Sequence, residues 1–171
     1  MARAMSFDEV TVRRAVVSDL PAVVALFKLP NEGNRLDLEG DKDPLDPVYV
    51  EALAAMNDDN ALYVADLPGA GVVGVFQLTF VRHVGYQGGL VAQIENVVVD
   101  RAHRSRGVGA TMMRFGVDLA RSRKAFRVQL TSNKTRTRAH AFYDKLGYTR
   151  VGEAVDERVD EPVNKGLAVV F

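Results

Sequence analysis

The sequence predicts an α/β protein with a single mixed, mostly antiparallel central sheet of six to seven strands, flanked by about four helices. Two observations lead to this fold class. Strand-like apolar runs alternate along the chain with segments of helical periodicity. Some neighbouring strands are joined by short turns, whereas others are separated by a helix, so hairpins and crossovers occur together. With 171 residues and no linker-like tract, residues 1–171 are expected to form one domain.

The first third of the chain is expected to contain one strand and two helices. Residues 10–16 are rich in β-branched side chains and predict a strand. Residues 18–28 begin with a serine suited to an N-cap and carry a proline in the first turn, which predicts a helix. Residues 31–46 are acidic and interrupted by Gly and Pro, so we expect a loop, followed by a helix over 48–56.

The middle of the chain is expected to form a hairpin, a long strand and an amphipathic helix. A Pro- and Gly-rich turn separates the strands 61–65 and 72–81. Three glycines mark the next turn, before the apolar strand 91–99. Residues 108–122 place apolar side chains three or four positions apart, which is typical of a helix that packs on a sheet.

The last third is expected to contain a strand, a helix and two closing strands. The strand covers 126–131, and the helix covers 137–146 with Gly147 as its C-terminal cap. The closing strands cover 148–151 and 167–170. The apolar final strand could pair with a second copy of the chain, so a homodimer remains open.

Composition excludes several classes of function. The chain contains no Cys, so disulfides, thiolate metal sites and a Cys nucleophile are excluded. No apolar run approaches 18 residues, so we expect no membrane span, and we expect a cytoplasmic protein. Its three His residues are scattered without a carboxylate pattern, so we expect no metal site. The sequence alone leaves open whether Met1 or Met5 is the start.

Charge is balanced over the chain but unevenly distributed. The 22 basic and 22 acidic residues cancel, yet residues 101–138 contain 11 basic residues and one acidic residue. Such asymmetry favours an anionic partner for this part of the surface. A nucleic-acid binder is an alternative, but aromatic side chains suited to base stacking are missing between these basic residues, so we expect no nucleic-acid partner.

A phosphate-binding pattern lies inside this basic stretch. Residues 97–110 predict a strand, a loop with two glycines, and the first turn of a helix. Free N–H groups and the positive end of the helix dipole make such a terminus suitable for an anion. No Lys follows Gly109, and Met112 stands where a dinucleotide fold needs its third Gly. Nucleotide hydrolysis and hydride transfer are therefore disfavoured.

Three motifs resemble the GCN5-related N-acetyltransferase (GNAT) family. The first is Arg104-x-x-Gly107-x-Gly109, which matches the family's pyrophosphate loop. The second, residues 140–148 (HAFYDKLGY), resembles a later family signature. The third, residues 129–133 (QLTSN), corresponds to the strand end that contacts the pantetheine arm in such enzymes. The resemblance implies a GNAT-like acyl-CoA N-acyltransferase fold and acetyl-CoA as cosubstrate.

The resemblance also implies which residues bind acetyl-CoA. Backbone groups of one strand end would pair with the pantetheine and the thioester carbonyl, and backbone N–H groups of the glycine loop would hold the pyrophosphate. The strand residues are Val97, Val98 and Val99, and the loop residues are Arg104, Ser105, Arg106, Gly107, Val108, Gly109 and Ala110. Asn133 would contact the pantetheine arm, Phe142 and Tyr143 would flank the sulfur, and Lys145 would reach the adenosine phosphates, with His140 near the cofactor.

Two residues are candidates for proton transfer. Glu95 interrupts an apolar run in a central strand, where burying a carboxylate is costly unless it is paired or used, so it is the candidate general base. A carboxylate paired with an Arg, or one facing a water-filled cleft, is the alternative. Tyr143 is the candidate acid, the alternative being a half-buried tyrosine that donates to a carbonyl.

The acceptor is less defined than the donor. His83 and Tyr86, in the loop before the long strand, could line its site, as could the acidic loop 31–46. We expect an enzyme that transfers acetyl from acetyl-CoA to a primary amine of a small molecule, by direct attack in a ternary complex. A protein Lys or N-terminal acetyltransferase and a non-catalytic CoA-sensing domain are the alternatives.

Overall fold

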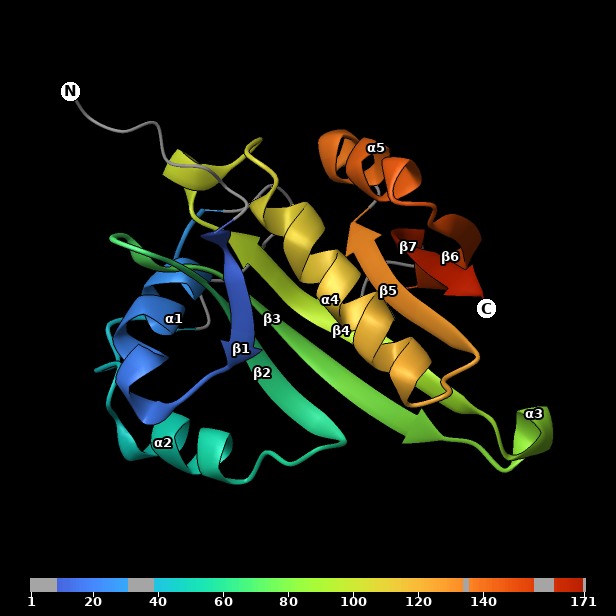
Figure 1. Ribbon diagram of the computed structural model, residues 1–171, viewed down its shortest axis with the longest axis horizontal. Coiled ribbons are helices and arrows are strands. Elements are labelled where there is room, and N and C mark those ends of the chain that lie inside the picture. Colours follow the sequence, from blue (N-terminus) through green and yellow to red (C-terminus); the bar gives the residue numbers. More distant parts are fainter. Residues whose placement is uncertain (1–8, 31–38, 134–135, 156–161, 171) are drawn as a thin grey trace.

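The computed structural model describes residues 9–30, 39–133, 136–155 and 162–170 (Figure 1). Its strands are β1 (Thr11–Arg14), β2 (Asn60–Leu67), β3 (Gly71–Arg82), β4 (Leu90–Val99), β5 (Arg127–Asn133), β6 (Thr149–Val155) and β7 (Pro162–Val170). Its helices are α1 (Leu20–Phe27), α2 (Pro47–Ala54), α3 (Gly85–Gly88), α4 (Val108–Ser122) and α5 (Thr137–Lys145), and short 3-10 turns occupy Val17–Asp19 and Arg101–His103.

The seven strands form one sheet in the order β1-β2-β3-β4-β5-β7-β6. Only β4 and β5 pair in parallel, and each other neighbouring pair is antiparallel. The parallel pair is connected by α4, because a parallel connection needs a crossover. These features confirm the expected mixed, mostly antiparallel sheet.

Helices pack on both faces of the sheet (Figure 1). On one face, α4 lies so close to the strands that a methyl group on Gly116 would come within 3.0 Å of Cδ1 of Ile94. Ile94 belongs to the main buried cluster, together with Phe76, Met112 and Tyr143. On the opposite face, α1 packs against β2 and β3 in a second, smaller cluster.

The second cluster covers only part of its face of the sheet. It contains Val23 and Leu26 of α1, and Leu62, Val64 and Val75 of the strands. Farther along β3 and β5, and in β4 from Ala92 to Glu95, side chains alternate between buried positions and more exposed ones. These alternating buried positions face α4, and the more exposed ones face away from it. The second face of the central strands is therefore incompletely covered there, whereas Val91 at the start of β4 is buried on it.

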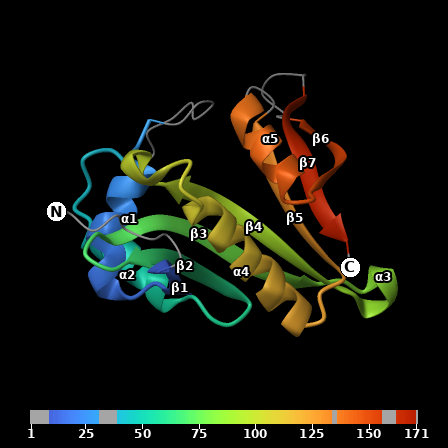
Figure 2. The same ribbon diagram turned by 45° about the horizontal axis from the view of Figure 1, so that its top comes forward.

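The β3–β4 connection differs from the expected simple turn. It contains the single-turn segment α3, in which Tyr86 and Gln87 have left-handed backbones with φ of 53° and 57°. The segment projects from one end of the sheet (Figure 2). The rings of His83 and Tyr86 meet there edge to face, with 5.6 Å between their centroids. This tip adjoins the start of β4, at the opposite end of that strand from Val99, so the two residues do not lie near the phosphate-binding pattern.

The final strand is not at an edge of the sheet. β7 pairs with β5 on one side and with β6 on the other. Its backbone groups are therefore engaged on both sides, and the expectation that it pairs across a homodimer is wrong. Among the described residues, no helix has the length and apolarity needed to span a bilayer.

Candidate active site

The two parallel strands at the centre of the sheet part from each other. β4 and β5 pair only from Val91 with Arg127 to Ile94 with Leu130. Beyond this point β5 continues to Asn133 along β7, and β4 continues to Val99 along β3. The facing edges of the two strand ends therefore lack ladder partners among the described residues, and each edge offers main-chain donors and acceptors.

A bulge in β4 marks the point where the strands part. Val75 pairs with Val98 and Gln77 pairs with Glu95, so Asn96 and Val97 together face one residue of β3. Asn96 has a left-handed backbone with φ of 53°, which few residues other than Gly adopt without cost. A bulge of this kind bends the strand and redirects its side chains. It is the local cause of the change in direction of β4.

The three valines that end β4 do not all direct their backbone groups to the edge where β4 has parted from β5. The Asp100 N–H donates to the carbonyl of Val73, and this register makes Val98 a hydrogen-bonded partner of β3. Because successive residues alternate, the backbone groups of Val97 and Val99 face the edge that β5 has left. Of the three residues predicted to bind the pantetheine by their backbone, Val98 is thus engaged in the sheet.

The phosphate loop, which we define as residues 104–110, follows directly from this strand end. Ser105 and Gly107 both have left-handed backbones, with φ of 60° and 90°. Alternating backbone hands of this kind turn successive N–H groups toward a common concavity. The loop is tied to the strand because Nε of Arg104 donates to the Val99 carbonyl at 3.0 Å.

The N-terminus of α4 has no side-chain cap. Gly107 is the N-cap residue and makes no side-chain hydrogen bond to the first turn. The N–H groups of Val108, Gly109 and Ala110 therefore lack an intrahelical or capping acceptor. Since α4 has 15 residues, the full positive end of its dipole lies at the same place. An uncapped terminus beside a basic loop can bind a phosphate group.

Two of the three motifs singled out in the sequence, the glycine loop and residues 140–148, meet the end of β4 at Gly109. A Cβ built on this glycine would lie 3.3 Å from Cζ of Phe142 and 3.7 Å from Cγ2 of Val99. The end of β4, the start of α4 and α5 are thus in contact at one point. The two loop glycines have different roles: Gly107 needs its positive φ, whereas Gly109 makes room for an aromatic ring.

Tyr143 lies beside Phe142 on α5 and is almost fully buried, with 5% of its surface exposed. Its ring contacts those of Phe142 and Tyr148 at centroid distances of 5.2 and 5.7 Å. Burial raises the pKa of the Tyr143 phenol above its usual value of 10, and the charge of Arg136 opposes this effect. The phenol therefore remains protonated at neutral pH and can donate its proton.

Glu95 is exposed, so the premise that its strand buries the carboxylate is wrong. Nε2 of Gln93 donates to its Oε1 at 3.0 Å. The side chain of the preceding residue, Ile94, is buried beneath α4, so Glu95 faces the opposite side of the sheet. Tyr143 is on the same side as Ile94. The two candidate proton-transfer residues therefore lie on opposite faces, and the parting of β4 and β5 is the opening between them.

The other predicted cofactor residues lie on or near α5 and the loop. His140 is buried, one helical turn before Tyr143, and Lys145 is exposed at the end of α5. Arg106 is exposed in the phosphate loop. Asn133 ends β5, and its side chain lies outside the described residues. The first half of the acidic loop proposed for the acceptor, residues 31–38, falls outside them as well.

One candidate residue was missed by sequence reasoning. The hydroxyl of Ser132 is buried near the end of β5 and has no hydrogen-bond partner among the described residues. Alternation puts its side chain on the α4 side, with Leu130. A buried hydroxyl without a partner is uncommon and needs an explanation. A serine in QLTSN has no sequence feature that reveals this, because its burial depends on elements distant in the chain.

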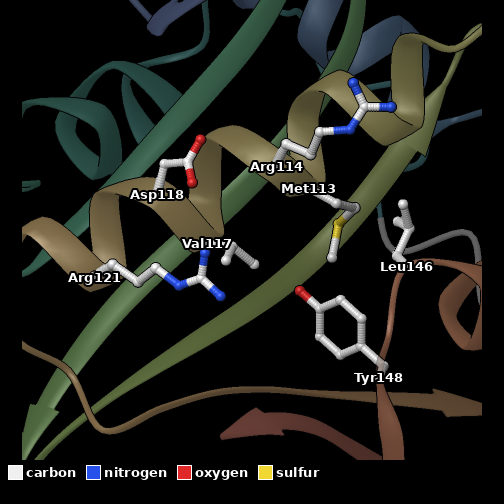
Figure 3. A pocket seen from close by; sticks show the side chains of 7 residues that line it. All are labelled: Met113, Arg114, Val117, Asp118, Arg121, Leu146 and Tyr148. Carbon is white, nitrogen blue, oxygen red and sulfur yellow. The ribbon is translucent and has the colours of Figure 1, made fainter. Parts of the chain in front are cut away.

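A cavity of about 310 Å³ lies beside Tyr148, whose ring contacts that of Tyr143. It follows one side of α4 and is bordered on the other side by Leu146 and Tyr148 (Figure 3). Burial raises the pKa of the Tyr148 hydroxyl, which has no hydrogen-bond partner. None of the residues that line this cavity was predicted to bind the cofactor or to act in catalysis. Among the described residues, no cluster of His and carboxylate side chains is suited to hold a metal ion.

The family model of the acetyltransferase (GNAT) family matches residues 23–148. The chain belongs to this family. The matched residues include the parted strands, the phosphate loop and Tyr143, so the family match covers the whole candidate site. The resemblance carried by residues 94–148 is thereby confirmed.

Two rice proteins (Oryza sativa subsp. japonica) are similar to this GNAT chain. A probable glucosamine 6-phosphate N-acetyltransferase 2 is 33% identical over 103 residues, which are 58% of this chain and 60% of the rice protein. A glucosamine 6-phosphate N-acetyltransferase 1 is 36% identical over 104 residues, 57% and 58% of the two chains. The chain thus spans about three-fifths of the length of these relatives.

Solved structures share the GNAT architecture. A transcriptional regulator from Bacillus halodurans C-125 has a TM-score of 0.73 at 30% identity, covering 86% of this chain and 97% of that one. The glucosamine-6-phosphate N-acetyltransferase of Arabidopsis thaliana has a TM-score of 0.68 at 21% identity, covering 88% and 99%. The second likeness concerns the fold alone.

Proposed function

We propose that this protein transfers the acetyl group of acetyl-CoA to the primary amine of a small molecule, with both substrates bound together. The observation that carries this proposal is the parting of β4 and β5, with Glu95 on one face of the sheet and Tyr143 on the other. An acetyl group in the opening between the strands would have a proton acceptor on one side and a proton donor on the other.

The chain's own residues fit acetyl-CoA. The uncapped N-terminus of α4 and the phosphate loop offer N–H groups to the pyrophosphate, with Arg106 at the same rim. The backbone edges of Val97 and Val99, which have no strand partner on the β5 side, offer hydrogen bonds to the pantetheine, although the Val99 carbonyl already accepts one from Arg104. The buried Ser132 hydroxyl offers a further one. The excess of basic residues in 101–138 suits a ligand with three phosphate groups.

The remaining residues would complete the binding site for acetyl-CoA. Phe142, packed on Gly109 and Val99, would border the thioester end of the ligand. His140 and Asn133 lie on neighbouring elements, α5 and the end of β5. Lys145 is exposed and would reach toward the adenosine phosphates. Acetyl-CoA would supply an activated thioester there.

The reaction requires three proton movements, which these residues and solvent can make. An amine is mostly protonated at pH 7, and only its lone pair can attack a carbonyl carbon, so Glu95 would accept one proton, directly or through water. As the C–N bond forms and the C–S bond breaks, the sulfur would gain a proton from the Tyr143 hydroxyl. The nitrogen still carries two protons after the attack, and it would lose one of them as the amide forms, which returns a proton to the Tyr143 oxygen through water. Direct transfer is favoured because the chain has no Cys to form a thiol acyl-enzyme.

A panel of amines incubated with acetyl-CoA tests the proposal. Released CoA is measured with a thiol reagent, to which the protein contributes no thiol of its own. The panel holds aliphatic amines, polyamines, amino sugars with and without phosphate, and Lys- or N-terminal peptides. Release of CoA with small amines supports the proposal, and release with peptides alone favours a protein acetyltransferase. CoA binding without transfer to any amine would identify a CoA-sensing domain.

A further inference from the structure

Polar side chains occupy one line across the incompletely covered face of the sheet. Asn60, Thr79, Gln93 and Gln129 come from β2, β3, β4 and β5, and each is paired in register with the next. We call these four residues the amide row. All four side chains are partly exposed. On β3, β4 and β5, the residue that follows each of them in the sequence is instead buried on the α4 side of the sheet.

Hydrogen bonds connect the amide row to the point where β4 leaves β5. Nε2 of Gln129 donates to Oε1 of Gln93 at 3.3 Å, and Nε2 of Gln93 donates to Oε1 of Glu95 at 3.0 Å. A second series of hydrogen bonds joins β2, β3 and β4. In it, the Gln77 side chain donates to Asn60 at 2.7 Å and accepts from Asn96 at 3.3 Å. Both series of hydrogen bonds end at the bulge of β4, one at Glu95, the candidate base, and the other at Asn96.

The amide row has hydrogen-bonding capacity beyond these contacts. A glutamine side chain can donate two hydrogen bonds and accept two. The contacts found for Gln93 use one donor and one acceptor, and those for Gln129 use one donor. Half-exposed amides can therefore bind a further polar group without breaking the row. In a sheet, β-branched and aromatic residues would pack better at these positions.

The chemistry of the row selects a class of acceptor. Amide and hydroxyl side chains both donate and accept hydrogen bonds, so they can pair with the hydroxyl groups of a ligand. They carry no negative charge that would neutralise an ammonium group. Glu95 is the charged member of the network, and it lies at the end nearest the opening. Neighbouring strands are ~4.8 Å apart, so Gln93 and Gln129 are separated by about the width of a sugar ring.

We propose that the amide row binds the hydroxyl groups of the acceptor, which is therefore a hydroxylated primary amine such as an amino sugar. The inference rests on the proposed acetyl transfer and concerns the acceptor side of the same site. The amine would lie at Glu95, and the hydroxyl groups would extend along β4 and β5 toward Gln93 and Gln129. A polyamine would instead need carboxylates along the row, and a purely apolar amine would leave its amides unsatisfied.

Steady-state kinetics with a pair of matched amines test this inference. Glucosamine carries hydroxyl groups on a six-membered ring, and cyclohexylamine has a six-membered ring without them. Each variant is compared with the native protein for the same amine, so the different pKa values of the amines cancel. In Gln129→Leu, KM for glucosamine should rise about five- to thirtyfold, the factor expected for one or two lost hydrogen bonds. KM for cyclohexylamine should change less than twofold.

Two controls keep the result interpretable. Gln87→Leu makes the same chemical change in α3, at the far end of β4, and should alter neither KM. If Gln129→Leu does not fold by circular dichroism, Gln129→Ser replaces the amide with a hydroxyl of shorter reach and should give a smaller increase of KM, for glucosamine alone. Sedimentation of both proteins reports whether a second copy covers the row.

Several outcomes would overturn the inference. An equal rise of KM for both amines would make the row structural, and no rise for either would remove it from the site. A dimer that dissociates in Gln129→Leu without an effect specific to glucosamine would assign this face to a second copy. Native kcat/KM values that are equal for both amines would refute the substrate class but leave acetyl transfer intact, whereas no transfer to any amine would refute the proposed function itself.

Discussion

Gly109 lies directly against the Phe142 ring, so close that a Cβ on this glycine would be 3.3 Å from ring atom Cζ. This contact joins the first turn of α4 to α5. A Cβ at this position would require the Phe142 ring to move by a few tenths of an ångström, and a branched side chain would require more. The phosphate loop and the Phe142–Tyr143 pair are therefore positioned by one another.

Enlarging Gly109 should destabilise this junction. Overpacking by a branched side chain typically costs about 1–3 kcal/mol, so Gly109→Val should lower the free energy of unfolding by that amount and weaken CoA binding. Urea denaturation and calorimetric titration measure the two effects. Shrinking the ring with Phe142→Leu should restore part of the loss in the double variant. Gly85→Val, where a Cβ meets nothing within 4 Å, is the control. Additive effects of Gly109→Val and Phe142→Leu would contradict the contact.

Gly107 should respond to a different property of the substituted residue. Its φ of 90° is left-handed, and a Cβ there would meet no atom within 4 Å. Gly107→Ala should therefore cost about 1–2 kcal/mol through backbone strain alone. Gly107→Asn should cost less, because asparagine tolerates the left-handed region better. Urea denaturation of both variants measures their free energies of unfolding and checks that the asparagine variant is the more stable. Equal stability of the alanine variant and the native protein would show that the loop adopts another backbone conformation.

Removing the basicity of Glu95 should slow acetyl transfer. Glu95→Gln keeps the shape of the side chain but cannot accept the amine proton, so turnover at neutral pH should fall by about 10²-fold or more. The deficit should shrink as pH rises and the free amine becomes abundant. Glu51→Gln, on the exposed surface of α2, should have no effect. Normal turnover of Glu95→Gln at pH 7 would transfer the role to solvent or to another group.

Tyr143→Phe should affect turnover more than binding. The ring and its packing remain, so affinity for acetyl-CoA should change by less than about 1 kcal/mol, whereas turnover should fall by about 10–10³-fold. The protonated phenol is the active form and burial raises its pKa above 10, so this group should cause loss of activity only at pH above 10. Tyr148→Phe removes a neighbouring buried hydroxyl and should leave turnover nearly unchanged. Loss of affinity with intact turnover at saturation would make Tyr143 a packing residue.

The pairing of Arg13 with Asp19 should make stability depend on acid pH. Nη1 and Nη2 of Arg13 donate to the two carboxylate oxygens at 2.7 and 2.9 Å, and the Val16 N–H donates at 2.8 Å. Hydrogen bonding from Arg13 is the main reason why the pKa of Asp19 lies below 3.8. The folded state thus binds this proton more weakly than the unfolded state.

The resulting stabilisation is present above the unfolded pKa of about 3.9 and is lost as pH falls through the lower folded-state value. Asp19→Asn should cost about 1.5–3 kcal/mol at pH 7, the usual contribution of hydrogen bonds to a charged group. The difference should narrow at pH below about 3. Urea denaturation at several pH values measures it, and a difference that stays constant down to pH 2 would exclude Asp19 as the titrating group.

Local patterns in the sequence were sufficient for the α/β class, for the order of the elements apart from α3, and for the glycine-containing loop between β4 and α4. Alternation of apolar residues reports which positions are buried, and a glycine pair between a strand and a helix is a local feature. The family resemblance implied that residues 104–110 and residues 140–148 both contact the cofactor, but the packing of Phe142 on Gly109 was not predicted.

Tertiary structure decided the features that depend on distant pairing. Register with β3 engages the backbone of Val98, the position of β7 between β5 and β6 removes it from the edge, and the bulge at Asn96 separates β4 from β5. The sequence showed Glu95 in an apolar strand, but only the packing of α4 over Ile94 decides that the carboxylate faces the open side. A strand has two faces and two edges, and its own residues do not specify which neighbour covers each, because that choice is made by contacts between segments far apart in the chain.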